Sequence, residues 1–401
     1  MNETEIVKAE EEYLAKVYRR FPVVAVRGKE AVIWDINGKE YIDCMGGYGV
    51  ALVGHSNPKV VEAIVEQSKK LITCHPSLYN DARANLLERL VKIAPKGLTS
   101  VFLSNSGAEA VEAAIKVAIK HTGRRKIISM TGGFHGKTLG ALSLTWNQKY
   151  RKPFESMLYP NVKFARFGDI ESLKKELDNE VAAVITEPIQ GETGIILPPD
   201  DYLKQVRELT STNGSLLIVD EIQSGLGRTG KMWAHMHWNI EPDIVTVAKG
   251  LGGGVPIAAT LAKPEVMNSL KVGEHSSTFG GNPLSCAAAS ATIDFILEQN
   301  LPRRAEELGT YFIDKLRTLS EESKYVREVR GLGLMIGIEM KFNIHEFLNR
   351  LLEKGIIPLY SSINIVRMLP PLVIKKEQLD FVYSKVRETL SERDWLQATK
   401  A

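Results

Sequence analysis

Leu216-Leu-Ile-Val-Asp220 and Ile244-Val-Thr-Val-Ala-Lys249 are the two stretches of sequence that decide the fold. Each is an apolar run without polar alternation, which is typical of a strand buried on both faces of a parallel sheet. Each run also ends in an ionisable residue, and the two lie about one crossover unit apart. The pattern predicts neighbouring parallel strands whose carboxyl ends bring Asp220 and Lys249 together.

Strand-like runs and amphipathic helices alternate on both sides of these stretches, from about residue 57 onward. Further strands are expected at 101–104, 126–130, 181–186 and 257–261, and helices at 58–71, 82–93, 109–121, 199–210 and 282–297. This alternation predicts an α/β fold in which helices cover both faces of a doubly wound, mainly parallel sheet. Residues 51–298 are expected to form this large domain.

The two ends of the chain have a different pattern. Residues 1–50 predict a helix over 3–18 and short strands at 23–26, 31–34 and 40–43, with turns at Gly28-Lys29 and Asn37-Gly38. After residue 299 we expect helices, a strand over 329–339, a strand near Ile365 and a final helix over 377–392. The pattern predicts a small α+β domain at 299–401, which the N-terminal segment joins.

The composition argues against several functional classes. The 401 residues include 51 Lys and Arg against 48 Asp and Glu, a net charge of +3, whereas binding nucleic acid through bulk charge needs clustered cations. No apolar window reaches the ~18 residues of a membrane span, and the acidic N-terminus lacks a signal-peptide pattern. The three cysteines show no C-x-x-C spacing, and the His235-x-His237 pair has no nearby third ligand for zinc. We expect a cytoplasmic protein with no metal, nucleic-acid partner or membrane segment.

Two glycine-rich loops suggest nucleotide binding. Thr131-Gly-Gly-Phe-His-Gly-Lys-Thr138 resembles a P-loop, with Leu216–Glu221 as a Walker B strand, so an ATPase is an alternative class. The P-loop pattern, however, requires glycine at position 131. Gly225-Leu-Gly-Arg-Thr-Gly230 matches the dinucleotide pattern, but residues 220–224 separate it from the preceding strand. Both matches lack the required context.

A third loop, Ser104-Asn-Ser-Gly-Ala-Glu109, favours phosphate binding at the start of a long helix, although a plain Ser N-cap is the alternative. Pyridoxal 5′-phosphate (PLP) fits this loop together with the two strand ends. Lys249 offers an amine for covalent attachment, Asp220 a partner for a protonated ring nitrogen, and Phe134 a ring to stack on the cofactor. A buried Asp–Lys salt bridge would explain the same strand ends without a cofactor.

The sequence resembles the class III aminotransferases of the ornithine and acetylornithine type over nearly its whole length. The resemblance implies PLP-dependent transferase fold type I, the aspartate aminotransferase-like fold. The matching blocks, in order, are 43–55, 105–109, 133–136, 187–192, 220–230, 248–250 and 278–283. Within this family the two glycine-rich loops have no nucleotide role.

The resemblance also implies roles for single residues in cofactor binding. Lys249 matches the lysine that bonds to PLP and moves the substrate proton, and Asp220 matches the partner of the pyridinium nitrogen. Gln223 is expected to approach the phenolic oxygen of PLP. The remaining cofactor contacts are expected from Ser106, Gly107 and Ala108 at the phosphate, Phe134 at the ring, and Thr278 from a second subunit. Ser277 is expected near the substrate, so the resemblance implies a homodimer with shared active sites.

Besides Ser277, three residues are expected to bind substrate. Arg367 matches the arginine that clamps the α-carboxylate of glutamate and 2-oxoglutarate through a bidentate fork. Glu187 matches the glutamate that covers this arginine when an ω-amino substrate is bound. Lys137 departs from the family, because relatives acting on acylated ornithine have an arginine there that holds the substrate carboxylate, and lysine replaces that fork with a point charge.

The resemblance is strongest to archaeal enzymes whose lysine or ornithine substrate hangs on a small acidic amino-group carrier protein of the LysW type, in lysine and arginine biosynthesis. A basic rim would steer such a partner. The rim residues expected near the mouth of the site are Arg19, Arg20, Arg27, Lys29, Lys137, Lys149, Arg151 and Lys152. Free N-acetylornithine or ornithine is the alternative substrate, and a binding-only paralogue is a third class, disfavoured because Lys249, Asp220 and Arg367 are all present.

Overall fold

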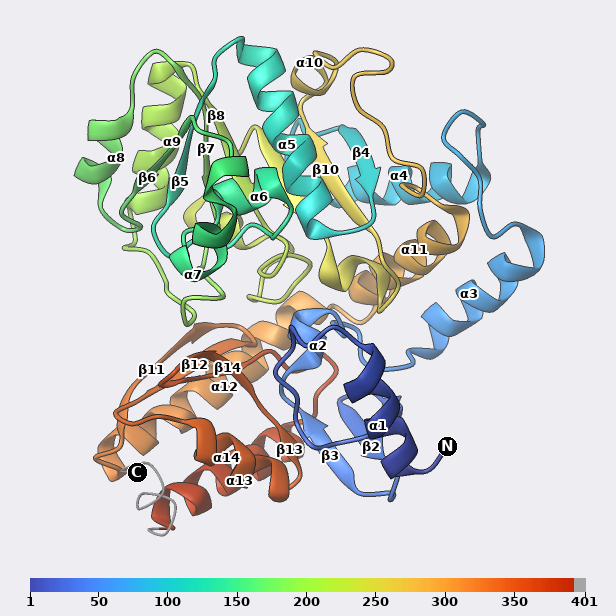
Figure 1. The fold of residues 1–401 in the computed structure, drawn as a ribbon, viewed down its shortest axis with the longest axis vertical. Helices are drawn as coiled ribbons and strands as arrows, with labels where there is room; N and C mark the ends of the chain where they lie inside the picture. The colour runs from blue at the N-terminus through green and yellow to red at the C-terminus, as the bar shows by residue number, and fades with distance from the viewer. Residues whose placement is uncertain (393–401) are drawn as a thin grey trace.

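The computed structural model describes residues 1–392, and its centre is a seven-stranded mixed sheet (Figure 1). The strands are ordered β4 (Ser100–Ser104), β10 (Ala258–Ala262), β9 (Ile244–Val247), β8 (Leu216–Asp220), β7 (Val181–Thr186), β5 (Lys126–Met130) and β6 (Val162–Ala165). All neighbours are parallel except β10, which is antiparallel to both β4 and β9. The prediction of a mainly parallel sheet is confirmed, and β8 and β9 are neighbours as the two decisive stretches predict.

Helices cover both faces of this sheet, as expected for a doubly wound fold. Alternate residues of β7 and β8 belong to different apolar clusters: Ile185 and Ile218 pack with α5 (Gly107–Thr122), whereas Val184 and Leu217 pack with α9 (Tyr202–Asn213). Successive side chains of a strand point to opposite faces, so α5 and α9 lie on opposite sides. All residues of β7, β8, β9 and β10 are buried, which explains their continuous apolar sequence.

The other helices of this part surround the sheet and connect its strands. They are α3 (Pro58–Lys70), α4 (Asp81–Ile93), α6 (Leu139–Leu144), α7 (Gln148–Arg151), α8 (Ile170–Glu176), α10 (Pro264–Met267) and α11 (Pro283–Glu298), with 3-10 turns at Lys152–Met157, Ala234–Trp238 and Lys249–Gly252. Helix α11 packs against both α3 and α4. None of the helices within residues 1–392 is both long and apolar enough to span a membrane.

The two ends of the chain pair with each other below the large sheet (Figure 1). After α1 (Glu3–Tyr13), strands β1 (Ala25–Lys29), β2 (Val32–Asp35) and β3 (Glu40–Asp43) form a sheet whose fourth strand is the C-terminal β13 (Ile356–Ile357). A second sheet has the order β11 (Val326–Leu332), β12 (Met335–Met340), β15 (Ile365–Met368) and β14 (Leu359–Ser362). Helices α2 (Gly46–Gly49), α12 (Leu301–Glu322), α13 (His345–Glu353) and α14 (Lys376–Ser391) complete this part.

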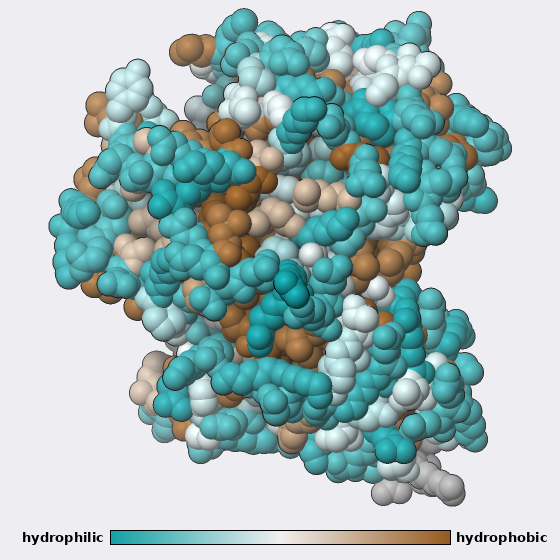
Figure 2. All heavy atoms as spheres, turned by 180° about the vertical axis from the view of Figure 1, so that it is seen from behind, coloured by the Kyte–Doolittle hydropathy of each residue, from teal (hydrophilic) through white to brown (hydrophobic). Residues whose placement is uncertain are grey.

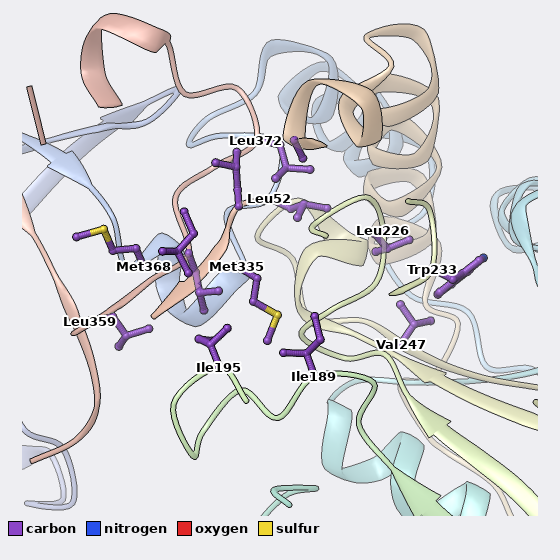
Figure 3. Close-up of a cluster of buried hydrophobic side chains, with 14 of the residues drawn as sticks. Leu52, Ile189, Ile195, Leu226, Trp233, Val247, Met335, Leu359, Met368 and Leu372 are labelled. Atoms are coloured by element: carbon purple, nitrogen blue, oxygen red, sulfur yellow. The ribbon is translucent and has the colours of Figure 1, made fainter. Parts of the chain in front are cut away.

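A continuous apolar core joins the large sheet to the C-terminal sheet. Figure 3 shows Ile189 and Ile195, from the loop after β7, approaching Met335 of β12. A backbone hydrogen bond also joins the two parts, because Leu372 N donates to Leu52 O at 2.8 Å. Residues at the carboxyl ends of the buried strands are thereby held close to β14 and β15.

Several local predictions differ from the structure, among them the helix expected over 3–18, which ends at Tyr13. The single strand expected over 329–339 is a hairpin, in which Leu332 pairs with Met335 around Gly333 at φ 56°. The turn expected at Gly28-Lys29 lies at Glu30-Ala31, because Lys29 pairs with Val32 and Glu30 takes the positive φ. Strand β6 was not expected, since Val162-Lys-Phe-Ala165 alternates polar and apolar residues at the sheet edge.

Candidate active site

A cavity of about 440 Å³ lies at the carboxyl ends of β8 and β9. Its lining includes Ser106, Gly107, Ala108, Phe134, Glu187, Asp220, Gln223 and Lys249. These residues come from five separate loops that follow strands or begin helices, in keeping with the rule that open α/β sheets bind ligands at their carboxyl edge. The structure therefore brings most of the predicted site residues into one cavity.

Asp220 is the last residue of β8 and is fixed by two hydrogen bonds. His135 Nδ1 donates to Asp220 Oδ2 at 2.7 Å, and Ile222 N donates to Oδ1 at 3.1 Å. Asp220 is 3% exposed and the His135 side chain is fully buried, so the carboxylate has one fixed orientation. A buried carboxylate held in this way favours a cationic ligand group beside it.

Lys249 follows β9 at the floor of the cavity. Its φ of 44° is unusual for a residue with a side chain, and the sharp turn places the chain at the edge of the sheet. Burial lowers the pKa of the Lys249 amine below its usual range, and nearby Arg367 acts in the same direction, against Glu192, Asp220 and Glu187. A lysine with a lowered pKa has a larger neutral fraction and can act as a nucleophile or a base.

The N-terminus of α5 forms a cup of backbone amides at the cavity wall. Ser106 is the N-cap, and Glu109 Oε2 accepts from both Asn105 N and Ser106 N at 2.7 Å, which completes a capping box. The next amides, of Gly107 and Ala108, belong to the first turn and have no partner within the helix. Gly107 also brings the backbone close to Ile222, whose Cδ1 would lie 2.9 Å from an added Cβ. The cup suits a phosphate group.

Gln223 supplies a polar atom without a protein partner. Its Oε1 is buried and makes no hydrogen bond within the described residues, although the side chain lines the cavity. A buried amide oxygen is costly unless a ligand or water completes its hydrogen bonding. Its position in the cavity fits a ligand that offers a hydroxyl group.

The structure corrects the assignment of Glu187 as the residue that covers Arg367. Glu187 Oε2 accepts from Phe134 N at 3.0 Å and Oε1 accepts from Gly191 N at 3.1 Å, so its carboxylate ties two loops together. Burial, assisted by Asp220, raises the pKa of Glu187 to about 7 against the opposing effect of His135. The two amides hold both carboxylate oxygens and keep them away from Arg367.

Glu192, five residues further on, is the partner of Arg367. Arg367 lies on β15 and is fully buried, and its Nη1 and Nη2 both donate to Glu192 Oε1 at 3.0 Å. Its guanidinium also lies 5.7 Å from the centroid of the Tyr48 ring. Because Glu192 lines the cavity and is less buried than Arg367, a ligand carboxylate can replace it at the guanidinium.

Besides Arg367, three predicted residues do not line this cavity. Ser277 and Thr278 line a separate hollow with Phe102, Glu112 and Phe279, and Ser277 Oγ accepts from Asn105 Nδ2 at 3.2 Å. Lys137 is exposed, and its Nζ lies 4.6 Å from the centroid of the Tyr150 ring. Asn105 borders both hollows, so the loop of Ser277 and Thr278 lies next to the N-terminus of α5 without entering the cavity of its own chain.

The expected basic rim is only partly assembled. Arg20 is paired with Glu10 and Glu11, and Arg27 and Lys29 line another hollow beside Trp34 and His55. The remaining cations lie at two places: one group lies in or against the segment that contains Tyr150, and a single residue lies near the ring of Tyr360. They are Lys137, Lys149, Arg151 and Lys152 in the first group, and Arg19, whose guanidinium lies 5.1 Å from the Tyr360 ring centroid.

Sequence reasoning missed the roles of His135, Glu192 and the tyrosines. His135 directly follows Phe134 in block 133–136, and Glu192 ends block 187–192. Both blocks resemble the family, but the resemblance assigned neither residue a role. Contacts across 85 and 175 residues join them to Asp220 and Arg367, and neither spacing is visible in sequence. No pattern in the sequence around Tyr48, Tyr150 or Tyr360 indicates that these residues lie near the site.

The dinucleotide alternative does not fit the packing. Gly227 and Gly230 lie against α12, where added Cβ atoms would lie 3.1 Å from Pro302 Cγ and 3.0 Å from Glu306 Cβ, so this loop has no room for a dinucleotide.

His235 Nδ1 pairs with Glu221 Oε1 at 2.9 Å, and within residues 1–392 no group of three or more His, Cys, Asp or Glu side chains is placed to hold a metal.

Comparison with known proteins decides the family. The family described as aminotransferase class-III matches residues 13–390. The chain belongs to the class III aminotransferases. This aminotransferase is 45% identical to the acetylornithine aminotransferase of Methanopyrus kandleri, over 95% of this chain and 97% of that protein. It is 44% identical to the LysW-aminoadipate semialdehyde transaminase of Deinococcus radiodurans, over 99% of this chain and 93% of that protein.

The fold of the aminotransferase agrees with a solved relative. The ornithine aminotransferase of Toxoplasma gondii, in which PLP partly occupies the active site, superimposes with a TM-score of 0.93 at 33% identity, covering 100% of this chain and 95% of that one. The enzyme therefore has PLP-dependent transferase fold type I, and PLP is its cofactor. The cavity fits PLP through the buried Asp220, the amide cup of α5 and the unpartnered Gln223 Oε1.

Proposed function

We propose that this aminotransferase moves the terminal amino group between a carrier-linked lysine or ornithine and the 2-oxoglutarate/glutamate pair. The observation that supports two such different substrates is the Arg367–Glu192 pair at the cavity wall. Glutamate and 2-oxoglutarate would displace Glu192 and bind Arg367 through a carboxylate. An ω-amine lacks a carboxylate at that position, so Glu192 would stay in place and neutralise the arginine.

The proposed roles of the inner residues follow from their positions. PLP supplies an electron-accepting ring on which the amino group is exchanged. Lys249 would hold the cofactor, and its amine would accept and return the substrate proton. Asp220, oriented by His135, keeps a proton on the ring nitrogen of the cofactor. Gln223 Oε1 would accept a hydrogen bond from a hydroxyl group of the cofactor, and Phe134 would pack on its ring.

The proposed phosphate site needs two chains. Ser106, Gly107 and Ala108 bind the phosphate through the first turn of α5, and Thr278 of a second copy completes the site, with Ser277 near the substrate. Support comes from the position of the Ser277–Thr278 loop, which borders the cup but not the cavity of its own chain. Exposed apolar side chains at Ile72, Leu78 and Phe279 favour a covering partner. Figure 2 shows apolar residues gathered toward the middle of one face.

The proposed division of the chain places the cofactor between two domains. The segment 1–50 joins the small domain at 299–401 through the β3–β13 pairing, and residues 51–298 form the large PLP-binding domain. Three free cysteines, two of them buried, suit a reducing compartment, and we place the enzyme in the cytoplasm.

A carrier-linked substrate is favoured over free N-acetylornithine by the cations beside Tyr150. Lys149, Arg151 and Lys152 lie in α7 and the turn that follows it, Lys137 lies over the Tyr150 ring, and within the described residues no ion pair neutralises these four cations. Such a cluster steers an acidic protein toward the cavity. The names of the relatives cover both substrates, so the choice between them rests on this charge.

The deciding experiment compares kcat/KM for carrier-linked lysine or ornithine with kcat/KM for N-acetylornithine, at low and raised salt. We expect the carrier-linked substrate to be preferred, with an advantage that falls as salt screens the cluster. Lys149→Glu with Lys152→Glu should reduce that advantage about tenfold, whereas Lys29→Glu, on a different hollow, should leave it unchanged. Equal use of both substrates would favour free N-acetylornithine, and a protein that binds PLP without turning over glutamate would be the binding-only paralogue.

A further inference from the structure

Arg83, in the first turn of α4, joins two loops from distant parts of the chain. Its Nη1 donates to Leu78 O at 2.9 Å and its Nη2 donates to Cys74 O at 2.6 Å, whereas its Nε donates to Gly281 O at 2.9 Å. All three acceptors are backbone carbonyls. A guanidinium presents its N–H groups in a fixed planar fork, so Arg83 sets the position of the 74–78 loop relative to the 277–281 loop.

The second of these loops carries Ser277 and Thr278, and it meets the guanidinium directly. Gly281 has a φ of 70°, and an added Cβ there would lie 3.0 Å from Arg83 Nε, so the backbone itself lies against the arginine. Gly280 N donates to Ser277 Oγ at 3.0 Å, which closes the loop on itself. The position of Thr278 therefore depends on the hydrogen bond that Arg83 makes at the end of its loop.

The two joined loops form an exposed apolar projection. Ile72, Leu78 and Tyr79 are exposed on or beside the first loop, and Phe279 is exposed on the second. Figure 1 shows the segment between α3 and α4 standing away from the large sheet at one side of the molecule. Apolar side chains held out in this way favour a covering partner. A second copy of this chain is the partner that fits, because the same projection carries Thr278, which lies outside the cavity of its own chain.

We propose that Arg83 is a positioning residue for the active site of the partner subunit, because it holds the 74–78 and 277–281 loops as one projection that places Thr278 at the PLP phosphate of the second copy. The inference rests on the proposed homodimer with shared sites. Arg83 lines neither the cavity nor the hollow of Thr278, so it acts through the loops and not on the cofactor. The arginine of one subunit thus sets how tightly its partner holds PLP.

Mixed dimers, purified through two different tags, separate an effect within one chain from an effect between chains. Lys249→Ala in one chain leaves a single working site, on the other chain. In the first dimer Arg83→Gln lies on the same chain as Lys249→Ala, so the working site meets the altered projection. In the second dimer the two substitutions lie on different chains, so the working site meets an intact projection. Both dimers contain the same substitutions, so a general loss of folding stability affects them equally.

We expect the working site of the first dimer to lose PLP about tenfold faster than that of the second, because one charge-assisted hydrogen bond to the phosphate is misplaced. The measurement is the PLP that stays covalently attached after dilution of the holoenzyme, with the glutamate half-reaction as a second readout. Arg83→Lys keeps the charge without the fork and should behave like Arg83→Gln. Arg89→Gln is the matched control, because Arg89 lies on the same helix but pairs with Asp294 at 2.9 Å, and it should change PLP loss less than about twofold.

Three results would overturn the proposal. Equal PLP loss from the two mixed dimers would mean that Arg83 supports the fold in general, and faster loss from the second dimer would mean that it acts on the site of its own chain. An Arg83→Gln homodimer that holds PLP as well as the wild type would show that the loops need no clamp. All three results leave the homodimer intact, whereas light scattering that shows an active wild-type monomer would contradict the proposed function as well.

Discussion

The inner and outer parts of the active site hold their charged groups in different ways. Inside, Asp220 and Lys249 lie at the ends of buried strands, and Glu187 is held by two backbone amides. Outside, Arg367 is held by a side chain, Glu192, and Arg19 rests on an aromatic ring. Hydrogen bonds from His135 and from backbone amides fix Asp220 and Glu187 before any ligand binds, whereas a substrate carboxylate can replace the side-chain contacts of the outer groups. Chemistry is therefore expected to depend on the inner part and substrate choice on the outer part.

The largest effect is expected from the inner lysine. Lys249→Ala should lower the rate of amino transfer from glutamate at least ~10⁴-fold, because it removes both the nucleophile and the base. Borohydride reduction followed by mass spectrometry should show covalently attached cofactor in the wild type and none in the variant. Lys29→Ala, on a distant hollow, should keep both activity and attachment. If the Lys249 variant kept activity within tenfold of the wild type, the chemistry would not depend on the inner part of the site.

Asp220→Asn should have the next largest effect. The amide cannot hold a proton on the cofactor's ring nitrogen, so we expect kcat to fall ~10²–10³-fold with little change in KM for glutamate. His135→Asn removes only the group that orients Asp220 and should cost less, about tenfold. The measurement is single-turnover kinetics with glutamate, together with PLP affinity. If Asp220→Asn raised KM and left kcat unchanged, Asp220 would belong with the substrate-binding groups.

The same contrast explains what the sequence could predict. Asp220 and Lys249 were predictable because a continuous apolar run indicates where a buried strand ends. Neighbouring parallel strands have their carboxyl ends at the same edge of the sheet, so the two residues meet there. Glu187 and Glu192 stand in one block, so sequence could say that a glutamate reaches Arg367 but not which one, since that depends on the direction in which the loop turns. The 331–333 hairpin depends on a close contact, because a Cβ at Gly333 would lie 2.5 Å from the Thr229 carbonyl carbon. Arg19 on Tyr360 is a long-range contact between exposed residues and leaves no periodic signal.

Glu187 should give a pH-dependent effect on stability. Its pKa in the folded protein is about 7, raised from 4.5 mainly by burial, so between these values the folded state binds more protons than the unfolded state. The stability linked to Glu187 is therefore present below about pH 4.5 and is lost as pH rises through 7. In cofactor-free protein, the free energy of unfolding of the wild type should fall relative to Glu187→Gln by up to ~3 kcal/mol between pH 4 and pH 8. Urea titrations at several pH values measure this difference, and parallel pH curves would contradict the raised pKa.

The smallest expected effect separates the two glutamates of one block. Glu192→Gln removes the charge that neutralises Arg367, so the arginine should bind glutamate and 2-oxoglutarate more readily and disfavour an ω-amine beside it. We expect KM for glutamate to fall and kcat/KM for the N-acyl diamine to fall, so that the ratio of the two half-reactions shifts about tenfold. Glu187→Gln is the matched control, since its hydrogen bonds go to backbone amides, and the ratio should stay within about twofold. A shift with Glu187→Gln and none with Glu192→Gln would assign the control of Arg367 to Glu187, and substrate choice would then depend on the inner part of the site.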